Sequence, residues 1–323
     1  MPDRRADFGA EGGLRIAALA GGVGGAKLAQ GLANLLPPSR LRIIVNTGDD
    51  FEHLGLTICP DVDTVVYTLA GISNPQTGWG LAGETFHCLP AIERLGGPSW
   101  FRLGDRDLAT HLVRTQALRE GRRLTEVVRR QAEALGVCHP VLPMADVPVR
   151  TCVLTDEGEL AFQDYFVRRR CEPTVSGFRW DAPEGATPSP EVRDALAWAD
   201  AVVLCPSNPF VSIDPILALP GVREAVAARP VVGVSPIIGG EAVKGPAAKM
   251  FRELGFVPSA YSVAEHYGDL LAGFFIDLVD ADYAADVVSL GADVRVAQTW
   301  MPELAQRVAL AEEVVALAVE LCG

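Results

Sequence analysis

The chain has 323 residues, of which 49% are hydrophobic and 21% charged, so it can bury the core of one large α/β domain. Its formal net charge of -13 argues against a general affinity for nucleic acid or for an anionic membrane, because both need a basic patch. Seven scattered cysteines without a Cys-x-x-Cys pair predict reduced thiols in a cytoplasmic protein. Residues 1–13 do not resemble a signal peptide, and no window is apolar enough for a membrane span.

The first predicted strand leads into a glycine-rich loop. Residues 14–20 are apolar, residues 21–25 read Gly-Gly-Val-Gly-Gly, and the following leucines recur at helical intervals. Glycines allow close backbone approach and a helix amino end presents unpaired N–H groups, so a phosphate is the expected ligand. The loop does not match a Walker A motif. It also misses the dinucleotide fingerprint, because Lys27 stands at the position of that motif's third glycine. A tight turn without a ligand is the structural alternative.

The second predicted strand, residues 41–45, is β-branched and runs into an acidic loop. Residues 46–50 read Asn-Thr-Gly-Asp-Asp, and Asp61 and Asp63 follow a short loop later. Open α/β sheets bind ligands at the carboxyl ends of their strands. Four carboxylates this close repel one another, so we expect a divalent cation such as Mg²⁺, a polyhydroxyl ligand or both to offset the repulsion. His53 is the one histidine beside this loop, and the other four are expected at the surface or in the interior.

The middle of the chain predicts an inserted layer. Residues from about 84 to 135 have helical spacing, and residues 149–154 and 160–167 flank a turn at 155–159, which is typical of a β-hairpin. The proline-rich segment 183–190 then separates this layer from a second α/β part.

In that second part, two more apolar strands end in polar or glycine-rich loops. Residues 201–205 run into Pro206-Ser207-Asn208-Pro209, and residues 230–234 run into the loop 235–240. The segment 302–321 has apolar residues at helical intervals and predicts a final helix.

These elements predict an α/β fold with a doubly wound, mainly parallel, Rossmann-like sheet. We expect one domain over residues 1–323, with the nucleotide-binding core in residues 14–82 and 191–323 and an inserted helical subdomain and β-hairpin in residues 83–190. The carboxyl ends of parallel strands share one edge, so the four loops should meet there and could enclose a nucleotide and a metal ion.

Several long segments resemble the 2-phospho-L-lactate transferase family of coenzyme F(420) biosynthesis. They are GGVGGAKL, VNTGDDFEHLGLTICPDVDTVVYTLAG, LGDRDLATHLVRT, FQDYFVRRR, PSNPFVSIDPIL and VSPIIGGEAVKGPAAK, in this order along the chain. The resemblance implies an enzyme that transfers a phospholactyl or phosphoenolpyruvyl group from a guanosine diphosphate-linked donor to the ribityl hydroxyl of the deazaflavin Fo and releases GMP. It also implies Mg²⁺ as cofactor and a homodimer.

The matching motifs imply residue roles. Asp63 and Arg102 match positions that hold Fo, and Trp79 is expected to stack on the deazaflavin or to anchor its loop. Asp49 and Asp50 are the catalytic candidates, and Asp50 also belongs with Asp61 to the candidate Mg²⁺ ligands; the sequence does not divide these duties. We expect Asp50→Asn to abolish turnover without unfolding the protein. The nucleotide-binding positions are Gly22, Val23, Gly24, Gly25, Lys27, Ser207, Asn208, Pro209, Ser235 and Gly239.

Two other functions fit parts of the sequence. One is a nucleotide-sugar-binding regulator of the gluconeogenesis-factor family, which the NTGDDF and LGDRDLATH segments disfavour. The other is a nicotinamide-dependent dehydrogenase, disfavoured because Lys27 breaks the fingerprint and Asn46 stands where a ribose-binding acid is expected. Whether the donor carries lactate, enolpyruvate or glycerate is left open.

Overall fold

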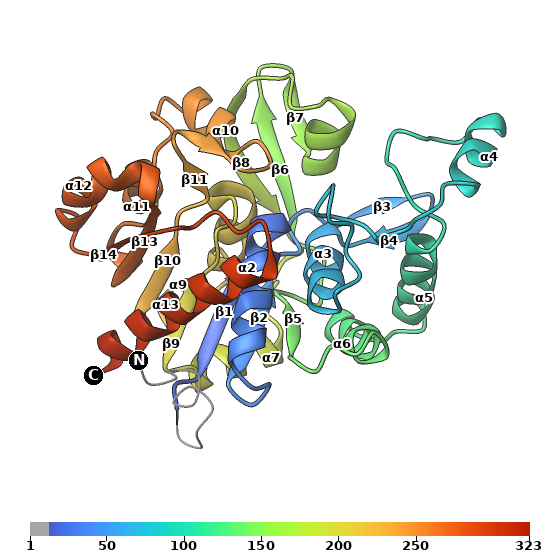
Figure 1. The fold of residues 1–323 in the computed structure, drawn as a ribbon. Coiled ribbons are helices and arrows are strands. Elements are labelled where there is room, and N and C mark those ends of the chain that lie inside the picture. Colours follow the sequence, from blue (N-terminus) through green and yellow to red (C-terminus); the bar gives the residue numbers. More distant parts are fainter. Residues whose placement is uncertain (1–12) are drawn as a thin grey trace.

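The computed structural model describes residues 13–323; residues 1–12, which include most of the segment tested for a signal peptide, lie outside the described part. A central sheet of seven strands has the order β14-β13-β10-β9-β1-β2-β5, and every neighbouring pair in it is parallel (Figure 1). Its strands are β1 (Ile16–Ala20), β2 (Leu41–Val45), β5 (Val141–Pro143), β9 (Ala201–Leu204), β10 (Val231–Val234), β13 (Gly273–Asp277) and β14 (Asp293–Ala297).

The strand order reverses between β1 and β9. From β1 the chain adds β2 and β5 on one side, and it later adds β9, β10, β13 and β14 on the other side. Loops at such a switch point diverge and leave a crevice outside the carboxyl ends of the strands. The loops after β1 and β9, at residues 21–25 and 206–208, flank this crevice.

Helices cover both faces of the sheet, as the predicted doubly wound fold requires. Alternate residues of β1 explain this, because Ala17 and Leu19 belong to one buried apolar cluster and Ile16, Ala18 and Ala20 to the other. The second cluster is covered by α2 (Gly22–Leu35), α3 (Pro60–Leu69) and α13 (Leu304–Cys322), and the first by α7 (Pro190–Trp198), α9 (Val222–Ala227), α10 (Ala247–Glu253) and α11 (Ala260–Tyr267).

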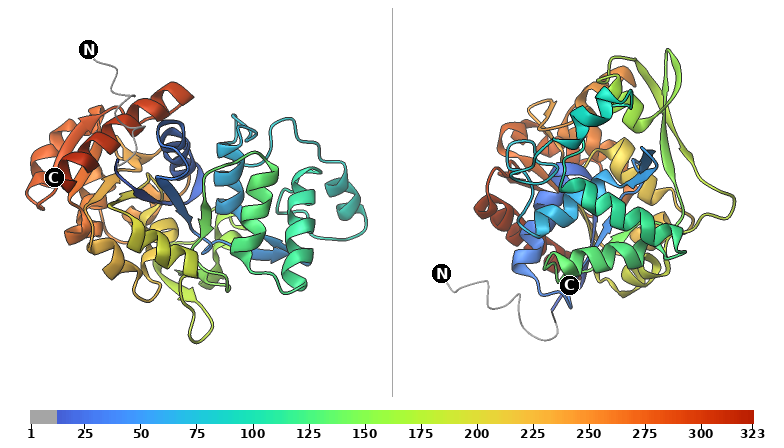
Figure 2. Two further views of the ribbon diagram at one scale, coloured as in Figure 1. Left: turned by 90° about the horizontal axis from the view of Figure 1, so that it is seen from below. Right: turned by 90° about the vertical axis from the view of Figure 1, so that its right-hand side faces the viewer.

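The predicted helical layer consists of α4 (Cys88–Arg94), α5 (Asp107–Arg119) and α6 (Leu124–Ala134). It lies beside the sheet, at the end of the molecule opposite the C-terminal helix (Figure 2). The short antiparallel pair β3 (Phe51–His53) and β4 (Leu56–Ile58) packs against α5. The segment 83–190 is not wholly separate from the core, since it also supplies β5 to the edge of the central sheet.

A second, three-stranded sheet contains the predicted hairpin, with β6 (Arg150–Thr155), β7 (Gly158–Ala161) and β8 (Val175–Asp181) in the order β7-β6-β8. The prediction that the second hairpin strand spans residues 160–167 was wrong in its extent. The strand ends at Ala161, and the π-helical turn η1 (Asp164–Arg168) follows. This turn buries Tyr165 and places Phe162 and Phe166 one above the other as a stacked pair, 5.5 Å between ring centroids.

The remaining elements are short connectors: α8 (Asp214–Leu217), α12 (Ala284–Val288), β11 (Ile237–Ile238), β12 (Glu241–Ala242), η2 (Pro209–Ile213), η3 (Gly268–Leu270) and η4 (Leu278–Tyr283). In the part of the chain that is described, no helix has the length and apolar character needed to cross a membrane. All seven cysteines are free.

Candidate active site

A cavity of about 690 Å³ opens at the carboxyl ends of the central strands. Its walls come from the loops after β1, β2, β9, β10 and β14, from the start of α3 and α5, and from the segment after β7. The predicted convergence of strand-end loops at one rim is therefore present. The volume lies in the upper part of the range for small-molecule sites, so the cavity has room for more than one ligand.

The glycine loop enters this cavity as the first turn of α2. Gly22 has a positive φ of 61°, which favours glycine, and its N–H donates to Asp61 Oδ1 at 2.6 Å. A Cβ on Gly24 would lie 2.2 Å from the Pro206 carbonyl oxygen, so only glycine lets the two loops approach. No side chain caps this helix, and the amides of Val23 and Gly24 at the cavity wall have no partner within the helix. The turn thus presents N–H groups to an anion.

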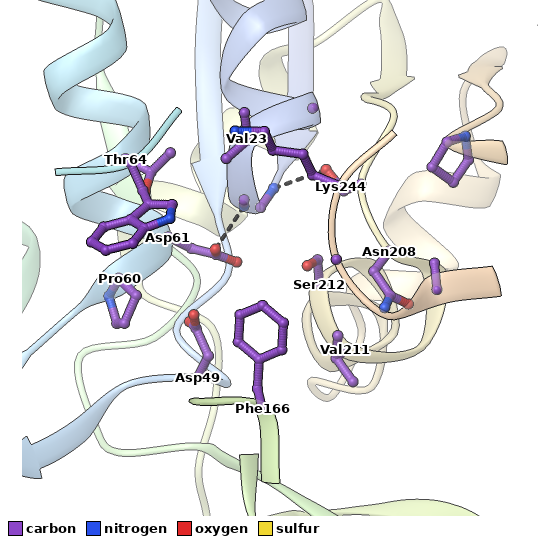
Figure 3. Close-up of a pocket in the computed structure, with 18 of the residues that line it drawn as sticks. Val23, Asp49, Pro60, Asp61, Thr64, Phe166, Asn208, Val211, Ser212 and Lys244 are labelled. Carbon is purple, nitrogen blue, oxygen red and sulfur yellow. Dashed lines mark hydrogen bonds between the residues drawn. The ribbon is translucent and has the colours of Figure 1, made fainter. Parts of the chain in front are cut away.

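Two carboxylates face the cavity around one amide side chain. Asn46 Nδ2 donates to Asp61 Oδ2 at 2.9 Å and lies 3.4 Å from Asp49 Oδ1. Gln163, from the segment after β7, donates to Asp49 Oδ2 at 3.4 Å. In Figure 3 the carboxylates of Asp49 and Asp61 point into the same space, with the ring of Phe166 beside them.

Burial and mutual repulsion perturb these two groups. Burial raises the pKa of Asp61 to about 6, although the hydrogen bonds from Asn46 and Gly22 act in the opposite direction. Burial, and then the charge of Asp61, raise the pKa of Asp49 well above its usual range. Within the described residues neither carboxylate forms an ion pair with a lysine or arginine. They are therefore buried carboxylates that lack a counter-ion, and a cation bound between them would favour their ionised form.

The other two aspartates of the acidic cluster have different surroundings. Asp63 lines the cavity and forms a two-pronged ion pair with the buried Arg114, with 3.0 Å between Nη1 and Oδ2. Asp50 does not line the cavity; the Cys59 thiol and Arg114 are its neighbours, and one of its oxygens is buried without a hydrogen bond. Burial raises the pKa of Asp50 well above its usual range.

Three basic side chains reach the cavity. Lys27 comes from α2, and burial, together with the nearby charges of Arg307 and Lys244, lowers its pKa. Among residues 13–323 nothing forms an ion pair or hydrogen bond with its ammonium group. Lys244 donates to the carbonyl of Thr77 across the cavity mouth, and Arg102 lies over the ring of Phe86 at 4.2 Å. The ammonium group of Lys27 can therefore bind an anionic ligand in the cavity.

Aromatic side chains line the cavity. Trp79 is 48% exposed and Trp300 is 53% exposed, which is unusual for tryptophan unless a ligand or partner covers it. Phe101 belongs to an aromatic cluster with Phe51 and His53, in which the rings of Phe51 and Phe101 meet edge to face at 4.8 Å. The cavity therefore offers exposed aromatic surfaces on which a flat ligand can stack.

Most of the residues predicted from the sequence line this one cavity, namely Gly22, Val23, Gly24, Lys27, Asp49, Asp61, Asp63, Trp79, Arg102, Ser207, Asn208 and Ser235. Four predicted residues do not: Gly25, Asp50, Pro209 and Gly239. A Cβ on Gly25 would lie 2.4 Å from Ser207 Oγ, so Gly25 packs beneath the wall. The Gly239 amide donates to the Asp280 carboxylate, and this hydrogen bond fixes the loop after β10 at a point outside the cavity lining.

Sequence reasoning missed several residues of the cavity. His111 was expected at the surface or in the interior, and it is buried yet contributes to the cavity wall. Gln163, Lys244 and Trp300 also line the cavity and were not singled out individually. Gln163 and Lys244 lie within the segments FQDYFVRRR and VSPIIGGEAVKGPAAK, so the family motifs contained a signal for both. No motif indicated Trp300.

The residues present fit a magnesium ion bound together with a phosphate. No group of three or more acidic, histidine or cysteine side chains is arranged as a complete ligand set in the described part of the chain. Mg²⁺ does not need one, because it is commonly held by one or two carboxylates, water and substrate phosphate oxygens. Asp49 and Asp61 supply such a pair next to the glycine turn, without a competing cation.

Comparison with known proteins identifies relatives over nearly the whole chain. The family model described as 2-phospho-L-lactate transferase CofD matches residues 16–289. The phosphoenolpyruvate transferase of Thermobifida fusca is 44% identical, covering 95% of this chain and 99% of its own. The 2-phospho-L-lactate transferase of Methanopyrus kandleri is 43% identical, covering 96% and 99%.

A solved structure shares the fold at low sequence identity. It is a UPF0052 family protein from Bacillus halodurans, with a TM-score of 0.64 and 15% identity over 95% of this chain and all of that one. This likeness supports the α/β architecture alone. The family model and the full-length relatives carry the assignment: the chain belongs to the 2-phospho-L-lactate transferase family of enzymes.

Proposed function

We propose that this enzyme transfers a phospholactyl or phosphoenolpyruvyl group from a guanosine diphosphate-linked donor to the ribityl hydroxyl of Fo, with release of GMP, in coenzyme F(420) biosynthesis. The observation that carries the proposal is the single cavity in which the glycine turn, two carboxylates without counter-ions and two exposed tryptophans meet. Phosphoryl transfer needs alignment and charge neutralisation rather than a covalent nucleophile, and these groups provide both.

The donor diphosphate is assigned to the glycine turn. Its amides at Val23 and Gly24 and the ammonium of Lys27 offset negative charge on phosphate oxygens, which rises on the leaving group as the bond to phosphorus breaks. Ser207 and Asn208 lie on the other side of the same turn and are proposed to contact the guanylate. Ser207 Oγ accepts from the Gly21 N–H at 3.0 Å, so this contact also fixes the turn.

The metal ligands are assigned to Asp49 and Asp61, in place of the pair Asp50 and Asp61 expected from sequence. The reason is that Asp50 lies behind the cavity wall, whereas Asp49 and Asp61 share the Asn46 amide at the wall. When bound there, Mg²⁺ would neutralise phosphate charge and lower the repulsion between the two carboxylates. Asn46 and Gln163 hold the carboxylates in place for it.

The acceptor is assigned to the part of the cavity next to α5. Asp63, which Arg114 holds in place, can accept a hydrogen bond from a hydroxyl of Fo. Arg102 and Trp79 flank this part and can bind the flat, electron-rich ring system. The phosphodiester forms when the hydroxyl oxygen bonds to phosphorus, GMP leaves and the hydroxyl proton passes to solvent or to a nearby carboxylate.

The deciding experiment is mass spectrometry of the product that the purified protein forms from Fo, Mg²⁺ and each guanylylated donor in turn. Phospholactyl and phosphoenolpyruvyl products differ in mass, so the donor is identified in the same measurement. Relatives named phosphoenolpyruvate transferase are 42–44% identical and those named 2-phospho-L-lactate transferase 38–43%, so the two ranges overlap and identity alone does not decide between the donors. Absence of any Fo phosphodiester with all donors would refute the proposal. A homodimer in the cytoplasm is also proposed and is tested by light scattering and cell fractionation.

A further inference from the structure

A buried polar network lies under the part of the cavity that faces the inserted helices. Asp63, Tyr67, Asp107 and His111 contribute to the cavity wall, and Arg114 lies behind them with 1% of its surface exposed. Among the described residues, Arg114 is the one lysine or arginine that forms an ion pair with a carboxylate of the cavity.

The contacts of Arg114 join four elements. Both terminal nitrogens bind the Asp63 carboxylate at the start of α3, and Nη1 also lies 3.5 Å from the Thr57 carbonyl on β4. Nη2 lies 3.4 Å from Gln131 Oε1 on α6, while Arg114 itself and His111 belong to α5. A planar guanidinium with these partners has one orientation, and this orientation fixes the direction of the Asp63 carboxylate.

His111 extends this network. Its Nδ1 lies 3.4 Å from Arg114 Nη1 and 3.7 Å from Asp63 Oδ2. Nε2 in turn faces Asp107 Oδ2 at 3.4 Å, and the Tyr67 hydroxyl lies 2.7 Å from Asp107 Oδ1. A continuous chain of polar groups therefore runs along this wall from Asp63 to Tyr67.

We propose that Arg114 is a positioning residue for the acceptor substrate, acting through Asp63 and, with His111, through the wall formed by Asp107 and Tyr67. It holds the Asp63 carboxylate in one orientation at the cavity wall, so that the carboxylate can accept a hydrogen bond from the acceptor. A buried ion pair adds little net stability compared with apolar packing, so stability alone is a weak reason for it. The proposal rests on the proposed function, because it takes a deazaflavin alcohol as the acceptor.

The test uses steady-state kinetics with the full-length protein, Fo and the guanylylated donor, and thermal unfolding of the same samples. Arg114→Gln should raise KM for Fo about tenfold or more while KM for the donor stays within about twofold. Arg114→Lys should recover part of the loss, since it restores the charge without the planar fork. Arg119→Gln is the matched control, because Arg119 lies on the same helix but is exposed and binds only the Gly55 carbonyl, at 2.8 Å.

A double variant keeps the test independent of folding. Arg114→Gln leaves the Asp63 charge buried and unpaired, whereas Arg114→Gln with Asp63→Asn removes both charges and should restore the unfolding midpoint. In the Asp63→Asn background, Arg114→Gln should change KM for Fo by less than about twofold, because Arg114 then has no carboxylate to orient.

Three results would overturn the inference. The first is an Arg114→Gln variant with a lowered midpoint but wild-type KM for Fo, which would mean a purely structural role. The second is an equal rise of KM for both substrates. The third is an undiminished effect of Arg114→Gln in the Asp63→Asn background. A wild-type protein that forms no product from Fo would instead refute the proposed function, so the two failures are distinguishable.

Discussion

The close approach of the glycine turn to the loop after β9 predicts a large effect of one methyl group. A Cβ on Gly24 would lie 2.2 Å from the Pro206 carbonyl oxygen, about 1 Å inside normal contact between carbon and oxygen. Both atoms belong to backbone that is fixed by buried neighbours, so Gly24→Ala must move the first turn of α2 away from β9 by roughly this distance. Gly24 has no positive φ, and the added methyl group itself is compatible with a helix.

Ligand binding should suffer more than stability. Overpacking costs about 1–3 kcal/mol, and the better helix propensity of alanine returns up to about 1 kcal/mol, so the loss of unfolding free energy should be about 0–2 kcal/mol. A shift of about 1 Å in the groups that hold a phosphate can cost about 100-fold, or about 2.7 kcal/mol of binding free energy. We expect the Kd for GDP with Mg²⁺ to rise by this factor.

Isothermal titration calorimetry with GDP, alongside thermal unfolding, measures both quantities. Gly177→Ala is the matched control, because its Cβ would meet only Leu154 Cδ1 at 3.5 Å, an ordinary contact on β8 outside the cavity. A Gly24→Ala protein that binds GDP within about threefold of wild type would refute the assignment of the diphosphate to this turn.

Three further predictions concern single side chains. Asp61→Asn should lower kcat about 100-fold or more. Asp50→Asn should lower kcat less, because Asp50 lies outside the cavity. A turnover assay in which Asp50→Asn has the larger effect would favour Asp50 as a metal ligand, as expected from sequence. Trp79→Ala should raise KM for Fo about three- to tenfold and Trp79→Phe much less, and equal KM values would exclude stacking. Hydrogen bonds, of which the one from the Thr85 hydroxyl has the largest effect, lower the pKa of Asp105 to about 2. The ionised carboxylate therefore stabilises the folded protein fully above about pH 4, and this contribution is lost as the pH falls towards 2. Asp105→Asn should therefore speed amide exchange at the start of α4 at pH 7 but not near pH 2, and a pH-independent difference would contradict this.

The core of the fold was predictable from local patterns. The apolar runs predicted at residues 41–45 and 201–205 become β2 and β9, and the glycine turn after the run at residues 14–20 opens α2 as expected. The segment 160–167 misled because its apolar residues on either side of Gln163 and Asp164 fit a strand as well as a tight helical turn. Only tertiary packing distinguishes the two, and the π-helical turn brings Phe166 to the cavity wall beside Phe162.

The loops of the site and most of its side chains were predictable, but the difference between the two adjacent aspartates was not. Asp49 and Asp50 are adjacent in sequence and chemically identical, yet one lines the cavity and the other lies behind its wall. This difference arises from the turn after β2, where the Gly48 N–H donates to Asn46 Oδ1 at 2.7 Å and the chain changes direction. A sequence pattern shows that both carboxylates are present, but it does not show which of them faces the cavity.

Charge compensation in the acidic cluster depends on contacts between distant segments. Asp63 and Arg114 are 51 positions apart, on α3 and on a helix of the inserted layer, and no local pattern pairs them. With Asp63 paired, Asp49 and Asp61 are the carboxylates of the acidic cluster that line the cavity without a lysine or arginine partner among the described residues. In the proposed mechanism these two hold one Mg²⁺ ion, and Asp63 contacts the acceptor. The inserted helices therefore have a proposed chemical role as well as a structural one, because they supply the arginine that orients Asp63, a contact that no sequence motif indicated.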